Sequence, residues 1–296
     1  MSQILVELIK LANLILNITR SVACCNRIGT VLELPCSQKS PQTEPATDAA
    51  APAIDFENVS LRYAGAGGDS LDGITFRASR GQTIGVIGGT GSGKTSLVNL
   101  IPRFYDATGG VVRVDGADVK DYPMQSLRRR IGVVPQKAVL FKGTIRENLL
   151  WGDPNASEET LHAALRAAQA EEIVAGKENG LDYEIEQGGR NLSGGQRQRL
   201  TIARALVRRP EILILDDSAS ALDFATDAAL RKALRALPEK PTVVIVSQRT
   251  SSIRHADEIL VLDNGRLVGR GTHDELLRSC AVYREIHESQ FKKEEA

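Results

Sequence analysis

Residues 83–101 read TIGVIGGTGSGKTSLVNLI: an apolar run, a glycine-rich loop and a second apolar run at helical spacing. The loop fits the phosphate-binding pattern GxxxxGK[ST], and it lies directly between a predicted strand and a predicted helix, which is the context that this pattern requires. Its glycines let backbone amides converge on phosphate oxygens, and the start of the helix adds the positive end of its dipole. The residues expected to bind phosphate are Gly88, Gly89, Thr90, Gly91, Ser92, Gly93, Lys94, Thr95 and Ser96.

Two side chains of this loop and two aspartates have separate expected roles. We expect Lys94 to reach the β- and γ-phosphates of a nucleotide and the Thr95 hydroxyl to bind Mg²⁺. The stretch ILILDD, residues 212–217, has the pattern of a buried strand that ends in two carboxylates. Asp216 would hold the same metal, since Mg²⁺ binds through one or two carboxylates together with phosphates. Asp217 is predicted to act as a general base or to position the attacking water.

A third motif, NLSGGQRQRL at residues 191–200, predicts another helix N-terminus suited to an anion. One nucleotide cannot easily use this end and the glycine-rich loop on the same face of one chain. Either the domain folds over itself or a second chain supplies one of the two ends.

The composition indicates a globular chain with no surplus of charge. Its 296 residues include 37 basic and 37 acidic side chains, so nucleic acid is not an expected partner. The cysteines show no ligand-like spacing, which favours a reducing, cytoplasmic compartment over a disulfide framework. They are Cys24, Cys25, Cys36 and Cys280.

The N-terminal third of the chain is expected to hold a helix, a linker and the start of a domain. In residues 4–18 the polar side chains recur every three to four positions, which predicts an amphipathic helix shorter than the roughly 20 apolar residues of a membrane span. Residues 35–53 are rich in Pro, Ala, Ser and Thr and are predicted to be a linker. From about Ile54 onward, strand and helix patterns mix, which predicts an α/β fold.

Taken together, the loop at 88–95, LSGGQ about a hundred residues later and the strand that ends at Asp216 resemble the nucleotide-binding domain of an ATP-binding cassette (ABC) transporter. The resemblance covers about residues 54–287, and smaller pieces agree with it in order. Tyr63 resembles the aromatic residue that stacks on adenine, Gln136 the Q-loop glutamine, and SALD at 220–223, with Asp223, the D-loop.

This resemblance implies a fold and a partner. The expected fold is a RecA-like P-loop NTPase core with an antiparallel β-subdomain and an α-helical subdomain at roughly 137–203. ATP and Mg²⁺ would lie between two such domains arranged head to tail. In that arrangement the signature residues of one chain close on the γ-phosphate bound by its partner; in this chain they are Ser193, Gly194, Gly195 and Gln196. Thr95, Gln136 and Asp216 are the implied metal site.

Further stretches resemble the exporter type of this family. These are PRFYDATGGVVRVDG (102–116) and LFKGTIRENL (140–149), and residues 1–34 are similar to the cytoplasmic end of an exporter's last membrane helix. The resemblance therefore implies a transmembrane partner and a place at the cytoplasmic face of a membrane. The surface around Gln136 would meet that partner. The transported substrate does not follow from these residues.

The expected catalytic residues are Asp217, Gln248, Gln136 and Lys94. The chain departs from the family at two of these four, Asp217 and Gln248. Hydrolytically competent members have glutamate where Asp217 stands and a switch histidine where Gln248 stands. The shorter carboxylate is withdrawn by about 1.5 Å, and glutamine cannot share a proton near neutral pH. We expect slow hydrolysis, as in the degenerate half of a heterodimeric exporter. A fully active homodimer and a soluble ABC ATPase or dimerisation module remain alternatives.

Overall fold

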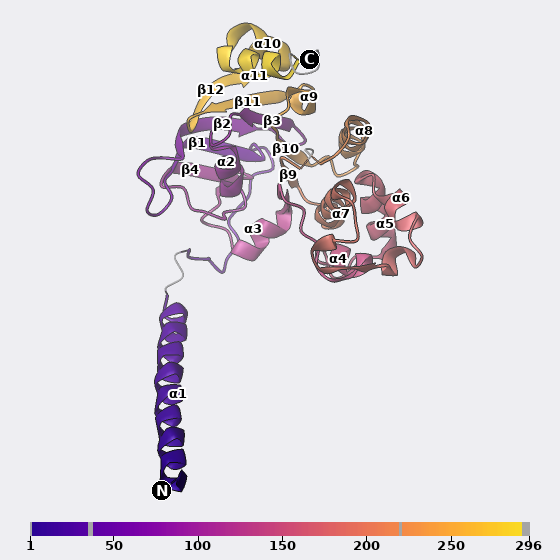
Figure 1. Cartoon of the computed structure of the whole chain (residues 1–296). Coiled ribbons are helices and arrows are strands. Elements are labelled where there is room, and N and C mark those ends of the chain that lie inside the picture. Colours follow the sequence, from indigo (N-terminus) through magenta and orange to yellow (C-terminus); the bar gives the residue numbers. More distant parts are fainter. Residues whose placement is uncertain (1, 35–37, 219–220, 292–296) are drawn as a thin grey trace. The chain divides into compact units, whose positions relative to one another are not determined.

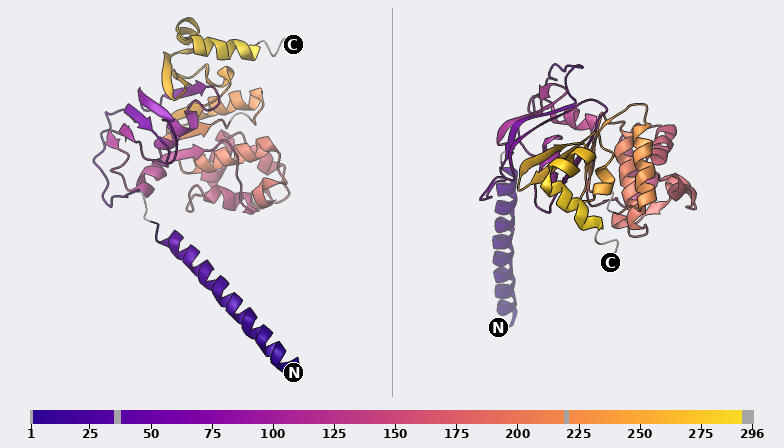
Figure 2. Two further views of the ribbon diagram at one scale, coloured as in Figure 1. Left: turned by 60° about the vertical axis from the view of Figure 1, so that its left-hand side comes forward. Right: turned by 90° about the horizontal axis from the view of Figure 1, so that it is seen from above.

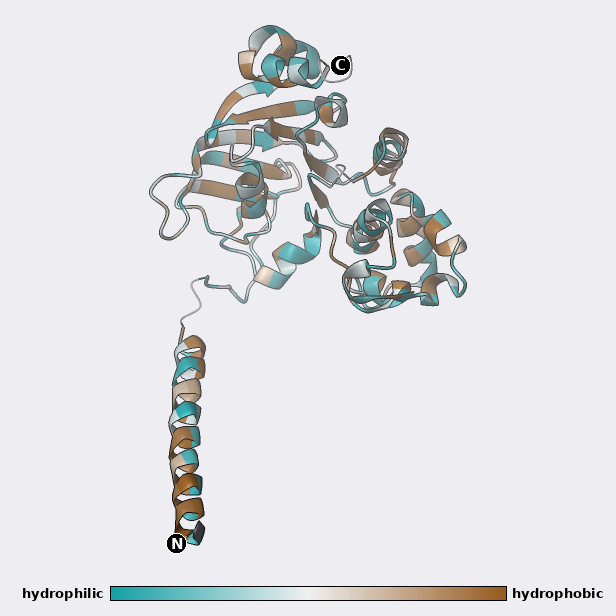
Figure 3. Ribbon diagram, viewed as in Figure 1, coloured by the Kyte–Doolittle hydropathy of each residue, from teal (hydrophilic) through white to brown (hydrophobic). Residues whose placement is uncertain are grey.

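The computed structural model describes residues 2–34, 38–218 and 221–291, and it divides between Lys39 and Ser40 into two units, each described by itself (Figure 1). The first unit is helix α1 (Ser2–Leu32), 31 residues long. Its exposed side chains include many large apolar ones, and Figure 3 shows these most densely toward the N-terminus. The helix extends about 47 Å and is long and apolar enough over Gln3–Leu32 to cross a membrane by length and composition. The amphipathic run at 4–18 is thus part of a longer helix.

The second unit is built on a six-stranded sheet in the order β12-β11-β3-β10-β9-β6. All neighbours in it are parallel except β11 and β12, which are antiparallel. Strands β3, β9 and β10 are buried throughout, as expected for parallel strands covered on both faces. The bounds are β3 (Thr83–Gly88), β6 (Ile131–Val134), β9 (Ile212–Asp216), β10 (Thr242–Val246), β11 (Glu258–Asp263) and β12 (Arg266–Gly271). Because parallel strands end at one edge, the segments after β3, β6, β9 and β10 meet there.

An antiparallel sheet in the order β2-β1-β4-β5 forms the β-subdomain. Its strands are β1 (Ile54–Leu61), β2 (Leu71–Ala78), β4 (Gly109–Val114) and β5 (Ala117–Asp118). Phe56 and Phe76 stack within its core, with ring centroids 4.6 Å apart. That core continues into one face of the parallel sheet and includes α2 (Lys94–Leu100), the helix after the glycine-rich loop.

Residues 40–53, which the sequence placed in the linker, lie against this subdomain. The Asp48 amide donates to the Asp115 carbonyl at 3.0 Å, and the Met124 amide donates to the Ser40 hydroxyl at 3.0 Å. The second unit therefore begins at Ser40, 14 residues before the expected Ile54.

The helical subdomain occupies the sequence between β6 and β9. Figures 1 and 2 show α4 to α7 grouped beside the six-stranded sheet. Its elements are β7 (Gly143–Thr144), α4 (Ile145–Leu150), α5 (Glu158–Ala167), α6 (Glu171–Ala175), η1 (Gly180–Asp182), β8 (Glu184–Ile185), η2 (Gln187–Gly189) and α7 (Gly194–Val207). The other helices are α3 (Met124–Arg130), α8 (Phe224–Arg235), α9 (Thr250–Ile253), α10 (His273–Ser279) and α11 (Ala281–Phe291). The mixture of helices and parallel strands confirms the predicted α/β class.

Candidate nucleotide-binding site

The glycine-rich loop is tightly packed at both ends and open at its tip. A Cβ added to Gly88 would lie 2.1 Å from the Leu262 carbonyl oxygen, and one added to Gly93 would lie 2.7 Å from the Ser70 carbonyl oxygen. Gly93 also has a φ of 96°, in the left-handed region that glycine adopts without a Cβ clash. At the tip, Cβ atoms on Gly89 and Gly91 would meet nothing within 4 Å. Residues 89–91 are exposed, so the tip is accessible to a phosphate.

Lys94 lies under this loop, where it is buried and bonded to the loop backbone. Its ammonium donates to the carbonyls of Gly88 at 2.9 Å and Gly89 at 2.6 Å. Burial lowers the pKa of Lys94, and the Asp217 and Asp216 carboxylates oppose this shift. A cation that is poorly solvated and faces the loop favours an incoming anion.

Thr95 and Asp216 meet across the gap between α2 and the end of β9. The Thr95 hydroxyl donates to Oδ1 of Asp216 at 3.3 Å. Burial raises the pKa of Asp216, so its carboxylate form lacks full compensation in the chain alone. Both groups offer oxygen, the ligand atom that Mg²⁺ prefers. In the described part of the chain no group of three or more His, Cys, Asp or Glu side chains could hold a metal.

The Asp217 carboxylate accepts hydrogen bonds from two other predicted site residues, Gln136 and Gln248. Its Oδ2 accepts from the Gln136 amide at 3.2 Å and from the Gln248 amide at 3.5 Å. Gln136 follows β6 and Gln248 follows β10, so the parallel topology gathers them at the sheet edge. Asp217 has a φ of 46°, and burial raises its pKa. The structure thus brings these three positions together, whereas their catalytic roles stay predictions.

Tyr63 lies beside the helix that follows the loop. Its hydroxyl donates to the Ser96 hydroxyl at 2.9 Å, and its ring meets the edge of Tyr105 with centroids 4.9 Å apart. Tyr63 thus belongs to the surroundings of the loop. Stacking on adenine remains a prediction for this side chain.

The signature residues form the start of α7. Ser193 is the N-cap, and its hydroxyl accepts from the Gln196 amide at 3.2 Å while the Gln196 side chain accepts from the Ser193 amide at 3.0 Å. This capping box leaves Gly194 open, since a Cβ there would meet nothing within 4 Å. Within the described residues no hydrogen bond or ion pair joins Ser193–Gln196 to the loop at 88–96.

Of the predicted D-loop, Ser220 lies outside the described residues and Asp223 caps α8. The Asp223 carboxylate accepts from both the amide and the hydroxyl of Thr226 at 2.8 Å, and these bonds lower its pKa. In this chain Asp223 therefore stabilises a helix start, and its contact with a nucleotide stays a prediction.

The sequence reading missed a contact between the Gln248 segment and the C-terminal helix. Gln290 of α11 donates to the Gln248 carbonyl at 2.6 Å, across 42 positions of sequence. No local pattern links two such distant segments.

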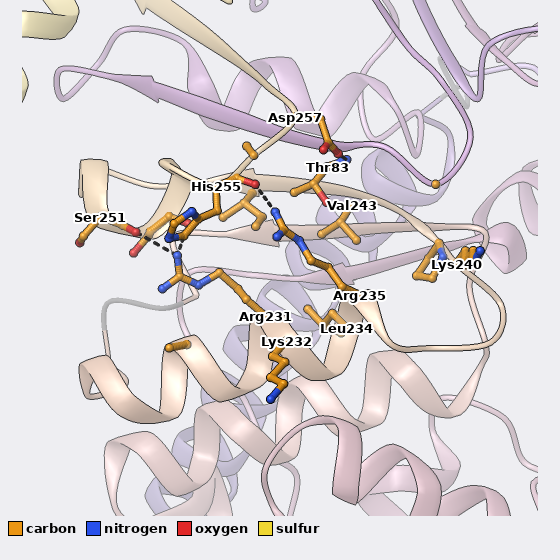
Figure 4. A pocket seen from close by; sticks show the side chains of 16 residues that line it. Thr83, Arg231, Lys232, Leu234, Arg235, Lys240, Val243, Ser251, His255 and Asp257 are labelled. Carbon is orange, nitrogen blue, oxygen red and sulfur yellow. Dashed lines mark hydrogen bonds between the residues drawn. The ribbon is translucent and has the colours of Figure 1, made fainter. Parts of the chain in front are cut away.

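A cavity of about 640 Å³ lies elsewhere, among β3, α8, β10 and α9 (Figure 4). None of the predicted site residues lines it. The candidate nucleotide site lies instead around residues 88–96, where the loop tip at 89–91 is exposed.

The chain is similar to known proteins over most of its length. The family model described as ABC transporter matches residues 71–220. An uncharacterized ABC transporter ATP-binding protein, YfiB of Bacillus subtilis (strain 168), is 43% identical over 281 residues, which are 95% of this chain and 48% of that protein. An ATP-dependent lipid A-core flippase of Xanthomonas oryzae pv. oryzae (strain MAFF 311018) is 40% identical over 280 residues, 94% of this chain and 47% of the flippase.

A solved structure of a bacterial Atm1-family ABC exporter with ATP bound superimposes with a TM-score of 0.85 at 34% identity, over 92% of this chain and 48% of that one. The chain thus spans about half the length of the curated relatives it matches. The predicted RecA-like core with its two subdomains is confirmed by the family match and this superposition. The chain belongs to the ABC transporter family, as an ATP-binding domain of the ATPase kind.

Proposed function

We propose that this domain binds Mg-ATP and pairs head to tail with a second ABC nucleotide-binding domain, and that the pair powers export with slow hydrolysis at this chain's own loop. The observation that carries the proposal is the shared contact at Oδ2 of Asp217, which Gln136 and Gln248 both approach. This contact brings the Q-loop residue Gln136 and the switch position Gln248 to the carboxylate of Asp217, the proposed base.

Head-to-tail pairing is supported by two exposed segments that are each suited to bind phosphate, the tip of the glycine-rich loop and the N-terminus of α7. The loop tip at 89–91 and the start of α7 at Gly194 are both accessible, and among the described residues no hydrogen bond or ion pair joins them. Each end has the geometry for an anion, with backbone amides at the start of a helix. A second domain would supply the α7 end to this loop and receive this chain's α7 in return.

Slow hydrolysis is supported by the shorter carboxylate. A glutamate would extend about 1.5 Å further toward an attacking water, and misplacement by about 1 Å can cost on the order of a hundredfold in rate. Gln248 can donate a hydrogen bond to a γ-phosphate but cannot take a proton near neutral pH. The intact Ser193–Gln196 segment would then complete the site of a competent partner.

Thr95 and Asp216 would hold Mg²⁺, with Gln136 nearby through Asp217. When bound, the ion supplies neutralisation of phosphate charge. The chain's own residues then have two tasks: Lys94 orients the phosphates, and Asp217 positions the water and accepts its proton.

A transmembrane partner is supported by an aromatic groove near the Q-loop. Phe141 and Trp151 stack with centroids 4.6 Å apart, yet they remain 44% and 64% exposed. With Phe104 they line a groove of about 300 Å³ beside Arg204. Exposed aromatic groups of this kind mark interaction sites. Together with the exporter and flippase relatives, the groove supports a place at the cytoplasmic face of a membrane.

The test is ATP turnover by the full chain over a range of protein concentrations, with nucleotide binding measured in parallel. The variants are Asp217→Glu, Gln248→His and the double mutant, and Lys94→Met is the inactive control. The proposal expects tight binding with little turnover, partly restored in the double mutant. Turnover of the unmodified chain that rises more steeply than linearly with concentration would support an active homodimer instead.

A further inference from the structure

The segment that carries Gln248 connects β10 to α9, and helix α11 lies over it. The amide side chain of Gln290 contacts both ends of a three-residue stretch. Its Nε2 donates to the Gln248 carbonyl at 2.6 Å, and its Oε1 accepts from the Thr250 amide at 2.9 Å. The Thr250 hydroxyl donates to the same Oε1 at 3.0 Å.

This contact restrains the backbone in a specific way. A glutamine amide is planar and carries a donor and an acceptor on opposite arms. Here the two arms bond the peptide groups on either side of Arg249, so one side chain fixes the direction of the chain after Gln248. The Gln248 side chain begins at this fixed backbone and reaches Asp217.

A second residue of α11 supports the contact from one turn away. Nδ1 of His287 lies 3.1 Å from the Thr250 hydroxyl. Residues three apart lie on the same face of a helix, so His287 and Gln290 present one surface to the segment. The contact therefore depends on the helix as a whole.

The other side of the segment is held by α8. Arg231 donates to the carbonyls of Ser251 at 2.9 Å and Ser252 at 2.8 Å, and Figure 4 shows it reaching from its helix toward Ser251. Arg231 is itself paired with Asp227 at 2.6 Å. These bonds anchor α9, whereas the bonds from Gln290 reach the peptide of Gln248 itself.

We infer that Gln290 is a positioning residue for the γ-phosphate: by fixing the peptide groups around Arg249, it directs the Gln248 side chain toward the nucleotide. This inference rests on the proposed contact between Gln248 and the γ-phosphate. ATP and ADP differ only in that phosphate, so the preference of the site for ATP depends on α11. The C-terminal helix thereby belongs to the machinery that recognises the nucleotide state.

The test is the ratio of the ADP and ATP dissociation constants, measured for the full chain with Mg²⁺ by titration of fluorescent nucleotide analogues. Gln248→Ala is expected to lower the preference for ATP about tenfold, as the loss of a hydrogen bond to a charged group does. Gln290→Met, which keeps the length of the side chain but removes its three hydrogen bonds to Gln248 and Thr250, should lower the preference for ATP several-fold. Ser289→Ala is the matched control, because Ser289 is exposed and, among the described residues, its hydroxyl bonds within its own helix, to the Ile286 carbonyl.

The double mutant Gln248→Ala with Gln290→Met distinguishes positioning from general support. If Gln290 acts through Gln248, the double mutant shows the same preference as Gln248→Ala alone. Gln290→Glu is a second variant in case the methionine variant folds poorly, since its carboxylate cannot donate to the Gln248 carbonyl. The melting temperature of every variant is recorded.

The outcomes separate two failures. The inference about Gln290 is overturned if Gln248→Ala loses preference for ATP but neither folded Gln290 variant does. It is also overturned if the two effects add in the double mutant. In both cases the contact between Gln248 and the γ-phosphate still stands. An unchanged preference in Gln248→Ala overturns the contact between Gln248 and the γ-phosphate, and the inference with it.

Discussion

Alanine substitutions at three glycines of the phosphate-binding loop separate backbone strain from steric overlap. At Gly93, φ is +96° and a Cβ would lie 2.7 Å from the Ser70 carbonyl oxygen and 2.9 Å from Cδ2 of Leu71. At Gly91, φ is +80° but no atom lies within 4 Å, and Gly89 has no neighbour within 4 Å and no left-handed φ. An alanine at Gly93 would therefore meet both backbone strain and steric overlap, one at Gly91 would meet backbone strain alone, and one at Gly89 would meet neither.

The expected losses follow from these geometries. An L side chain in the left-handed region costs about 1–2 kcal/mol, and forced overlap in packed surroundings adds about 1–3 kcal/mol. Gly89→Ala should change the free energy of unfolding by less than about 0.5 kcal/mol. Gly91→Ala should lower it by about 1–2 kcal/mol and Gly93→Ala by about 2–5 kcal/mol.

The measurement is urea unfolding without nucleotide, followed by far-ultraviolet circular dichroism, because bound ATP would stabilise the folded state and mask the differences. Gly89→Ala is the control for the substitution itself. The reasoning is refuted if Gly93→Ala is as stable as Gly89→Ala, or if Gly91→Ala loses more than Gly93→Ala.

Three further predictions follow from the site and the C-terminal helices. Lys94→Met should weaken ATP binding about ten- to a hundredfold, the loss of a charged hydrogen-bond donor, with little loss of stability because a buried charge is also removed; nucleotide titration and urea unfolding measure the two effects. Removal of Mg²⁺ by a chelator should abolish turnover and weaken ATP binding in the unmodified chain, and should change binding less in Thr95→Ala, where a metal ligand is already missing; an equal change in both would argue against Thr95 as a ligand. Burial raises the pKa of Tyr283 to about 12, so the folded chain keeps a proton that the unfolded chain loses near pH 10, and the associated stability is full below about pH 10 and lost toward pH 12. As the pH rises from about 9.5 to 11.5, the free energy of unfolding should therefore fall by about 1–2 kcal/mol less in Tyr283→Phe than in the unmodified chain. Urea unfolding at each pH measures this difference.

The sequence predicted best what is local. The loop at 88–95 needs only its own glycines and its flanking strand and helix, and ILILD at 212–216 forms the buried strand that its apolar run predicts. The meeting of Gln136, Asp217 and Gln248 could be expected in outline, because each follows a strand of one parallel sheet.

What the sequence could not give depends on distant contacts. That one oxygen of Asp217 faces two amides is set by side-chain positions across 81 and 31 residues of sequence. Residues 40–53 have the composition of a linker, yet their bonds to Asp115 and Met124 hold them on the domain. Helix α1 continues past residue 18 to Leu32. The hydrophobic periodicity that predicted a helix weakens after residue 18, but helix formation does not require it.

The backbone at Asp217 links the candidate chemistry of this site to the stability of the turn that carries it. Its φ of 46° is a conformation that aspartate and asparagine adopt more readily than longer side chains do. A change to glutamate would gain catalytic reach while losing up to about 1 kcal/mol of fold stability at the same turn. If a partner domain performs most of the turnover, as proposed above, the left-handed turn favours the aspartate that stands here over the longer glutamate.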